Sequence, residues 1–354
     1  MIAGANTVSA IIMLIIGYSD RINPTEHPLL ANAGLIFPII LAVNIGFLVF
    51  FSIFKKRYML ITLAGLVAAY KPVRTYCPLN IEKEAPADVI KVMSYNVHYF
   101  DKSKATDDNP DPILTYILKS GADIVCMQEA RLDGRIEEAI KDIYDYKDSV
   151  MTPSNGNGLL VFSRYPILAK EKIKYKSKNN LSAAFKIKIK DDTVTVINNH
   201  FEVSGLSIAD RNGFNDMVKG KSTRDTVRAE SKRLLTKLSE ATAIRAPQAE
   251  AVAEYIRQTD GNVILCGDFN DTPISYTHHI LAKELTDCHT STANGPGFTY
   301  KRHAIFVRID NIMCSKSWKP YKCEVDNSND FSDHHPIYCM LERVGKTKKD
   351  GTNQ

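Results

Sequence analysis

The chain has 354 residues, with 45 Lys and Arg against 40 Asp and Glu, a formal net charge of +5, 44% apolar residues and 24% charged residues. This composition excludes a disordered chain and a collagen-like repeat. The charge is unevenly spread, because residues 1–70 contain only six charged side chains: Asp20, Arg21, Glu26, Lys55, Lys56 and Arg57. A segment so poor in charge is not built for water, which argues against a simple soluble enzyme. With net +2 in residues 1–70 and net +2 in residues 341–354, only +1 remains for residues 71–340, so bulk charge gives no support for nucleic-acid binding.

Two uncharged runs in this segment predict membrane-spanning helices. Residues 33–54 read AGLIFPIILAVNIGFLVFFSIF, and about 20 apolar residues suffice to cross a hydrocarbon core of ~30 Å. The alternative for this run is a buried core helix of a soluble protein. Residues 1–19 are also uncharged, and no Lys or Arg precedes their apolar centre. A first spanning helix is therefore favoured over a cleaved secretory signal, which needs a basic start.

The third run, residues 58–70, decides the topology. As a helix it would measure only about 20 Å, which is short for a span, so the alternatives are spanning the membrane and lying in its interface. The basic loop Lys55–Arg57 is expected to stay in the cytoplasm by the positive-inside rule. We favour spanning, which predicts a multi-pass anchor over residues 1–76 and an extracytoplasmic body. If residues 58–70 lie in the interface instead, the body is cytoplasmic.

After a linker over residues 77–87, the body from 88 to 342 alternates short apolar runs with helical segments. A helix is expected over Ile113–Lys119, and the strands are expected at Val89–Val97, Asp123–Gln128, Leu159–Ser163, Phe185–Ile189, Thr193–Asn198, Val263–Cys266, Arg308–Cys314, Tyr321–Val325 and Pro336–Met340. Hairpins and helices are mixed without strict strand–helix alternation. The fold class is therefore α/β of the α+β type, with sheets packed face to face and helices outside.

Residues 206–258 form a helical insertion in this pattern, in which Pro247 is expected to begin a second helix. Its stretch Met217–Arg228 is rich in basic residues and contains Gly220. We interpret it either as part of two ordinary surface helices or as a basic flap over an anionic substrate. Residues 343–354 are expected to be a basic, disordered tail.

Polar residues that can bind metals recur at the ends of the predicted strands. The set comprises Asn96, Gln128, Glu129, Asn198, Asn199, His200, Asp268, Asn270, Asp310, Asp333 and His334. Taken singly, each has an ordinary structural explanation, such as a turn cap for Asn96 or a core histidine for His200. Because strand ends place side chains on one rim of a sheet and hold them rigidly, the whole set predicts a single site.

The chemistry of this set indicates phosphate-ester cleavage assisted by a metal. Oxygen ligands from Glu129, Asn96 and Asp333 suit a hard divalent cation such as Mg²⁺, with Mn²⁺ as the alternative. No cluster of soft ligands suggests zinc. Two histidines with nearby carboxylates, His200 and His334, add positive charge and acid–base capacity near neutral pH. A metal, a base and donors for phosphate oxygens are the parts that this reaction needs.

An ordered series of motifs in the body carries a family resemblance. The motifs are SYNV (94–97), MQE (127–129), SRYPI (163–167), NNHF (198–201), GDFNDTP (267–273), FTY (298–300), RID (308–310) and SDHHP (332–336). In this order they closely resemble the endonuclease/exonuclease/phosphatase superfamily. The resemblance covers about residues 88–342 and implies the deoxyribonuclease-I-like fold, a four-layer α/β sandwich of two packed mixed sheets flanked by helices.

The resemblance also implies roles for individual residues. Glu129 and Asn96 match the positions that hold the catalytic Mg²⁺, and Asp333 matches a second carboxylate near the metal. His334 matches the histidine that contacts or polarises the scissile phosphate. Asp310 matches the carboxylate that orients this histidine.

Further matches complete the implied site. Asp268 matches the residue that activates the attacking water, and Asn270 matches the donor that positions the phosphate. His200 matches the histidine that the nuclease, sphingomyelinase and inositol-phosphatase branches use as a phosphate donor or acid. Arg164 is expected to anchor the rim of the site by ion pairing and to help bind substrate. The chain departs from apurinic-site endonucleases, which carry Tyr-Val-Pro-Asn where residues 198–201 read NNHF.

The sequence therefore predicts a membrane-anchored, Mg²⁺-dependent hydrolase of phosphate esters, in which water attacks the phosphorus in line. A nucleic acid is one candidate substrate, and a phospholipid, sphingomyelin or inositol phosphate is the other. A catalytically inactive module that binds anions in the same pocket is a remote alternative. The expected partners are the substrate and the lipid bilayer, and the sequence indicates no obligate protein partner.

Overall fold

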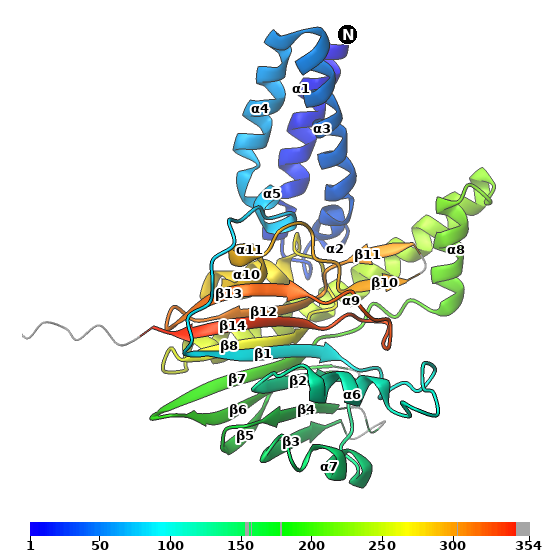
Figure 1. The fold of residues 1–354 in the computed structure, drawn as a ribbon. Helices are drawn as coiled ribbons and strands as arrows, with labels where there is room; N and C mark the ends of the chain where they lie inside the picture. Colours follow the sequence, from blue (N-terminus) through cyan, green and yellow to red (C-terminus); the bar gives the residue numbers. More distant parts are fainter. Residues whose placement is uncertain (153–155, 157, 178, 303, 345–354) are drawn as a thin grey trace, which may run out of the picture.

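Two six-stranded sheets packed face to face form the body of the protein, and a helical bundle rises from one side of it (Figure 1). The computed structural model describes residues 1–152, 156, 158–177, 179–302 and 304–344. Of the predicted basic tail, residues 345–354 lie outside this range. Arg343 is the last residue of a strand, and its guanidinium Nε donates to Asp192 at 2.9 Å, so the ordered body extends past residue 342.

The first sheet has the strand order β13-β14-β1-β2-β4-β3, and the second has the order β5-β6-β7-β8-β12-β9. The strands of the first sheet are β1 (Val89–Asn96), β2 (Ile124–Gln128), β3 (Tyr146–Met151), β4 (Gly158–Ser163), β13 (Trp318–Val325) and β14 (Ile337–Arg343). Those of the second sheet are β5 (Ile167–Ile173), β6 (Leu181–Ile189), β7 (Asp192–His200), β8 (Val263–Asp268), β9 (Thr286–Asp287) and β12 (Asp310–Cys314). Strands β10 (Tyr300–Arg302) and β11 (Ile305–Val307) form a separate hairpin.

Each sheet is mixed, as predicted, with one parallel pair among antiparallel neighbours. β1 runs parallel to β2, and β7 runs parallel to β8. The predicted hairpin is confirmed, since β6 pairs with β7 and its Phe185, Ile187 and Ile189 point into the core while the intervening lysines stay half-exposed. Strands β3 and β5 were not predicted. Both lie at sheet edges, where their polar sequences can remain wet on one side.

Helices cover the outer face of each sheet and complete the four layers. The first sheet is covered by α6 (Pro112–Lys119) and α7 (Gly134–Ile140), whose apolar residues join its outer core. The second is covered by the C-terminal half of α9 (Arg224–Arg257) and by α10 (Tyr276–Glu284). The short helix α11 (Cys288–Thr292) lies beside β12 and β13. The predicted fold class is confirmed.

The helical insertion differs from its prediction in one respect. α8 (Ile208–Val218) and α9 form a hairpin, and α9 continues without a break through Pro247. Proline inside a helix removes one hydrogen bond and clashes with the preceding turn, which is why the sequence suggested a helix start at this residue. The packing of Ala249, Val252 and Ile256 into the core offsets that cost.

The N-terminal 76 residues form a bundle of three long helices that alternate in direction, with short connecting elements. The long helices are α1 (Ile2–Gly17), α3 (Phe37–Phe54) and α4 (Lys56–Ala68), and the connecting elements are η1 (Ser19–Arg21), α2 (Pro28–Ala31), η2 (Asn32–Ile36) and α5 (Tyr70–Tyr76). Two stretches, Ile2–Arg21 and Pro28–Phe54, are long and apolar enough to cross a membrane, although a soluble core helix or a signal sequence meets the same criterion. α4 has 13 residues and is shorter than either stretch.

Buried polar residues join the three helices of the bundle to one another. The Asn44 amide donates to the Ser9 hydroxyl at 3.0 Å, which links α3 to α1. The Thr62 hydroxyl donates to the Asn6 side chain at 2.9 Å, which links α4 to α1. Such contacts between helices are typical of membrane bundles, where apolar surfaces alone give no preference for helix over lipid.

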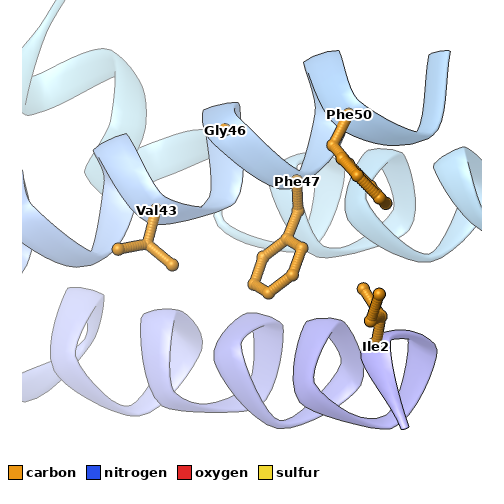
Figure 2. Close-up of a pocket in the computed structure, with 5 residues that line it drawn as sticks. All are labelled: Ile2, Val43, Gly46, Phe47 and Phe50. Atoms are coloured by element: carbon orange, nitrogen blue, oxygen red, sulfur yellow. The ribbon is translucent and has the colours of Figure 1, made fainter. Parts of the chain in front are cut away.

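An apolar groove runs between α1 and α3 near the end of the bundle that is far from the body (Figure 2). It is lined by Ile2, Val43, Gly46, Phe47 and Phe50, and Phe47 points from α3 toward α1. No polar side chain lines it, so it offers a surface for apolar chains and none for the chemistry of the predicted site.

The bundle is fixed to the body through its lower connections. Asn32 accepts a hydrogen bond from Thr242 of α9 at 3.1 Å, and Asp20 pairs with His279 of α10 at 3.0 Å. The buried Arg308, two residues before the site residue Asp310, donates to the Thr75 carbonyl at 2.7 Å. The predicted linker, residues 77–87, contains no helix or strand, and its Asn80 donates to the Ala293 carbonyl at 2.6 Å.

Candidate functional site

The predicted site residues meet where the parallel strands of the two sheets end. Asn96 ends β1, Gln128 ends β2, His200 ends β7 and Asp268 ends β8. Because the sheets pack face to face, these four ends lie together between the layers. β12 runs antiparallel to β8 and begins with Asp310 directly opposite Asp268, so a fifth strand delivers a carboxylate to the same place.

A histidine between two carboxylates forms the centre of the site. His334 Nδ1 lies 2.8 Å from Asp310 Oδ2, and His334 Nε2 lies 3.8 Å from Asp268 Oδ2. All three side chains are buried. Asp310 is held in place by its backbone N–H, which donates to the Thr299 hydroxyl at 3.1 Å. This arrangement orients the imidazole through Nδ1 and leaves Nε2 directed toward Asp268.

A second cluster of side chains adjoins this centre. The Asn96 amide Nδ2 donates to Asp268 Oδ2 at 3.1 Å and to Glu129 Oε1 at 3.3 Å. His200 Nε2 lies 3.7 Å from Glu129 Oε1 and 3.8 Å from Asp268 Oδ2, and within the described part of the chain it has no hydrogen-bond partner. Two carboxylates and an unpaired imidazole nitrogen therefore converge on one point.

The backbone is strained where it presents these groups. Glu129 has φ +50°, a left-handed conformation that is costly for a residue with a side chain, and its carbonyl accepts from Tyr99 N at 2.8 Å. Asn270 has φ +51°, which asparagine tolerates better, and its N–H donates to Asp268 Oδ1 at 2.7 Å. Gly267 has φ +141°, and a Cβ there would lie 2.1 Å from the Asn199 carbonyl oxygen, so only glycine fits next to the end of β7.

Burial and neighbouring charges shift the pKa values of the site residues in different directions. Burial raises the pKa of Asp268 to about 7, and the Asp310 carboxylate adds to the rise. Burial alone would lower the pKa of His334, but the carboxylates of Asp310 and Asp268 outweigh it and raise that pKa to about 10. Burial lowers the pKa of His200 against the opposing effect of Glu129. Near neutral pH, His334 is therefore a cation and His200 a neutral imidazole, while Asp268 has a pKa suited to a general base.

The remaining predicted residues lie at different distances from this cluster. Asn270 is adjacent, and its amide donates to the Phe201 carbonyl at 3.0 Å. Asp333 is half-buried and lies next to Asn96 through Ser332, whose hydroxyl donates to the Asn96 backbone carbonyl at 2.8 Å and lies 3.4 Å from Asp333 Oδ1.

Arg164 does not lie with the site, so the prediction that it anchors the site rim and binds substrate is wrong. It forms the expected ion pair, with Asp123 at 3.3 Å, but Asp123 precedes β2, whereas the site lies beyond the other end of that strand. β4 runs antiparallel to β2, with Leu159 opposite Gln128 and Ser163 opposite Ile124. Leu159 and Ser163 are four residues apart along β4, which at 3.4 Å per residue separates them by about 14 Å. Arg164 would lie at the rim of the site only if β4 ran in the opposite direction, and the SRYPI motif alone does not reveal the direction of the strand.

Two residues outside the predicted set lie next to His334. The Tyr300 ring meets the His334 ring edge to face, with centroids 5.2 Å apart. Arg211 of α8 donates to the Tyr300 hydroxyl at 2.9 Å. Tyr300 belongs to the FTY motif, so its position could have suggested a role. Arg211 lies in an insertion with no motif, and nothing in the sequence marked it.

The residues of the cluster fit a hard divalent cation. Carboxylate oxygens of Asp268 and Asp310 lie within 4.8 Å of one another and of a ring nitrogen of His334, which as an imidazolium would not itself bind the metal. Within the described residues, the buried oxygen Asp310 Oδ1 has no hydrogen-bond partner, and Glu129 and Asp268 share a single amide donor. Carboxylate and amide oxygens are the ligands that Mg²⁺ and Mn²⁺ prefer. A cation near Asn96, Glu129 and Asp268 would offset the charge gathered there.

Comparison with known proteins agrees with this geometry. Residues 93–334 match the model of the endonuclease/exonuclease/phosphatase family.

The chain belongs to the endonuclease/exonuclease/phosphatase family.

Members of this family are phosphoric ester hydrolases, and they generally use a divalent metal. Residues 1–76 match a separate domain of unknown function. No curated protein sequence matches the chain.

Solved structures with the same fold belong to this family as well. A family member from Beutenbergia cavernae is 18% identical, with a TM-score of 0.52, and the match covers 73% of this chain and 72% of that chain. The human nocturnin catalytic domain, solved with a bound sulfate anion, is 16% identical, with a TM-score of 0.51 and a match over 72% of this chain and 94% of that chain. At these identities the similarity establishes the fold, and the chemistry of this chain is argued from its own residues.

Proposed function

We propose that this chain is a membrane-anchored hydrolase of phosphate esters that depends on a divalent cation, Mg²⁺ or alternatively Mn²⁺. The observation that carries the proposal is the convergence of Asp268, His334, Asp310, Glu129 and His200 from five separate segments onto one buried point. Structural ion pairs rarely gather so many titrating groups with unpaired atoms, and perturbed pKa values in such a cluster are typical of active sites.

The geometry supports an in-line attack of water on phosphorus. Asp268 accepts a proton from the water, the water oxygen bonds to phosphorus, and the opposite P–O bond breaks as the leaving oxygen takes up a proton. The cationic His334 stabilises the charge on the phosphate oxygens, and Asp310 holds its ring in place. A second hydrogen of the Asn270 amide and the neutral His200 can hold the remaining oxygens. A cation held by Glu129 and Asn96 would offset the negative charge that develops in the transition state.

The N-terminal bundle supports a membrane location with the site on the extracytoplasmic side. The N-terminus and the loop Lys55–Arg57 both lie at the end of the bundle that is far from the body (Figure 1). If the bundle crosses a bilayer, the positive-inside rule assigns this end to the cytoplasm. α4 then serves as the third crossing. Its exposed apolar residues Leu60 and Val67 suit contact with lipid.

The substrate is a phosphate ester of one of two classes. A membrane anchor favours a phospholipid, sphingomyelin or inositol phosphate, because the enzyme is then held beside its substrate. A nucleic acid is the second candidate, favoured by the basic α8–α9 hairpin. The net charge of only +1 over residues 71–340 argues against long nucleic acids.

A substrate panel tests the proposal. Purified full-length protein is assayed against DNA, RNA, sphingomyelin, inositol phosphates and a generic nitrophenyl phosphodiester, each with Mg²⁺ and with EDTA. We expect EDTA-sensitive hydrolysis of at least one substrate and its loss in His334→Ala. Near-wild-type turnover by His334→Ala would overturn the assignment of the site. A wild-type protein that binds phosphate without turnover would also overturn the proposal and would indicate an anion-binding module.

A further inference from the structure

The α8–α9 hairpin ends in a tip, Val218–Arg228, that projects away from the two sheets (Figure 1). We propose that this tip binds the anionic headgroup surface of the same bilayer that the bundle crosses. The inference rests on the membrane anchoring proposed above and adds a second contact with the membrane, made by the catalytic body itself.

The position of α9 brings the tip to the level of the bilayer. Thr242 of α9 donates to Asn32, at the start of the second apolar stretch, so α9 passes the lower end of the bundle there. From Thr242 back to Arg224 the helix continues for 18 residues, or about 27 Å at 1.5 Å per residue. Figure 1 shows the hairpin rising on the same side of the body as the bundle. If the bundle crosses a bilayer of about 30 Å, its lower end lies at one surface of that bilayer, and a hairpin that leaves from this end on the side of the bundle lies next to the same surface.

The charge of the tip is positive and unneutralised. It carries Lys219, Lys221, Arg224 and Arg228 against the single acid Asp225, a net charge of +3. All five side chains are exposed, and in the part of the chain that the structure describes none of them forms an ion pair. Clusters of this kind next to a membrane are attracted to anionic lipids within a Debye length of the surface.

The base of the same hairpin is built differently. There the buried Asp210 accepts from Lys237 at 2.5 Å and pairs with Arg233 at 3.0 Å, and the Ser207–Asp210 capping box closes the start of α8. The basic residues at the base are therefore used to hold the two helices together. The four basic residues at the tip have no such ion-pair partner among the described residues, so holding the two helices together does not account for them.

Two exposed valines give the tip an apolar component. Val218 is 61% exposed at the end of α8, and Val227 is 36% exposed in the first turns of α9. Apolar side chains flanked by Lys and Arg are typical of segments that lie at the headgroup boundary, where the apolar groups enter the acyl region and the charged ends stay in the polar layer. A nucleic acid would use the charge and leave the valines in water, so the bilayer is the better match.

The hairpin also connects the membrane surface to the site. Arg211, on the inner part of α8, donates to Tyr300, whose ring contacts His334. A hairpin seated on headgroups would therefore place the rim of the site beside phosphate esters in the bilayer.

Fluorescence quenching tests the contact directly. The full-length Val218→Trp variant is reconstituted into vesicles of equal parts phosphatidylcholine and phosphatidylglycerol, with bromine on the acyl chains. The only native tryptophan, Trp318, is buried in β13 and provides a constant background. The matched control is Lys141→Trp, at the end of α7 on the opposite side of the body (Figure 1).

We expect strong quenching of Val218→Trp and none of Lys141→Trp. Quenching should fall several-fold in pure phosphatidylcholine and in a variant that also carries Lys219→Glu and Lys221→Glu. Two results would overturn the hairpin contact and leave the anchor intact. One is equal quenching at both positions, and the other is Val218→Trp fluorescence that bromine does not quench in protein that resists carbonate extraction. Protein that carbonate extracts from the vesicles contradicts the anchor, and the hairpin contact with it. If the protein retards DNA in a gel-shift assay while Val218→Trp stays unquenched, the tip binds nucleic acid instead.

Discussion

Replacing Asp310 by asparagine tests how the site orients and charges its histidine. The substitution keeps the shape of the side chain and removes its negative charge. Asp310 Oδ2 lies 2.8 Å from His334 Nδ1, and both side chains are buried. We expect Asp310→Asn to fold normally and to hydrolyse phosphate esters slowly.

The size of the loss follows from this one hydrogen bond. A buried hydrogen bond to a charged group contributes about 1.5–3 kcal/mol, and about 1.4 kcal/mol corresponds to a tenfold change in rate. If the bond acts mainly in the transition state, kcat falls roughly 10- to 100-fold. The loss should also depend on pH. Asp310 makes the largest of the contributions that, against burial, raise the pKa of His334 from 6.5 to about 10, so the imidazolium is stabilised below pH 6.5 and that stabilisation disappears as the pH rises through 10. Without the carboxylate this pKa falls, and the deficit in kcat should widen between pH 6 and pH 9.

The assay is steady-state hydrolysis by full-length protein across this pH range, with thermal unfolding as the control for folding. Asp287→Asn is a matched control, because Asp287 Oδ2 lies 3.0 Å from the buried His278 Nε2, in a similar pair that the site does not contain. It should lower the melting temperature without moving the pH profile. An Asp310→Asn enzyme with wild-type kcat and an unchanged profile would refute the reasoning.

Three further outcomes follow from other parts of the chain. Gly267→Ala would force a Cβ to within 2.1 Å of the Asn199 carbonyl at φ +141°, so thermal unfolding should show a loss of more than about 2 kcal/mol, and an unchanged melting temperature would contradict this. Arg245→Met would leave the buried Asp271 without its ion-pair partner at 3.2 Å and should lower the free energy of unfolding by about 3–5 kcal/mol. The double variant Arg245→Met/Asp271→Asn should recover part of this loss, and an equal loss in the single and the double variant would contradict the pairing. A Leu79→Cys variant, exposed just after the bundle, should react with an impermeant maleimide in intact cells, and labelling only after permeabilisation would assign the body to the cytoplasm.

Much of the fold and site could be predicted because the signals are local. Apolar runs that end in polar, metal-capable residues define β1, β2, β7 and β8 and also the rim where they meet. The alternation of lysine with apolar residues in β6 gives both the strand and its wet face. Asp268, Asp310 and His334 come together because adjacent strand ends must share one edge, whatever the intervening loops do.

The misses depend on contacts between distant segments. The edge strands β3 and β5 have polar sequences, since half of each lies in water, so no apolar pattern marks them. Arg164 was assigned to the wrong end of a strand because direction is set by pairing partners. The unbroken path of α9 through Pro247 depends on core packing that only the folded sheet supplies.

The docking of the bundle onto the body could not be predicted from the sequence either. An apolar segment with few charges, followed by a linker, suggests a loose tether, whereas Asn32, Thr75 and Asn80 contact the body directly. Each of these contacts joins residues more than 150 positions apart, and on the side of the bundle and linker none belongs to a motif.

The most direct test of the central claim is the Mg²⁺ dependence of phosphate-ester hydrolysis in wild type and Asp268→Asn, measured side by side on full-length protein. The account predicts that wild-type activity disappears in EDTA and returns with a saturable dependence on added Mg²⁺. It predicts that Asp268→Asn unfolds at a similar temperature yet loses roughly 10²- to 10⁴-fold in kcat, the usual effect of removing a general base. Activity that survives EDTA, or an Asp268→Asn enzyme within a few-fold of wild type, would contradict it.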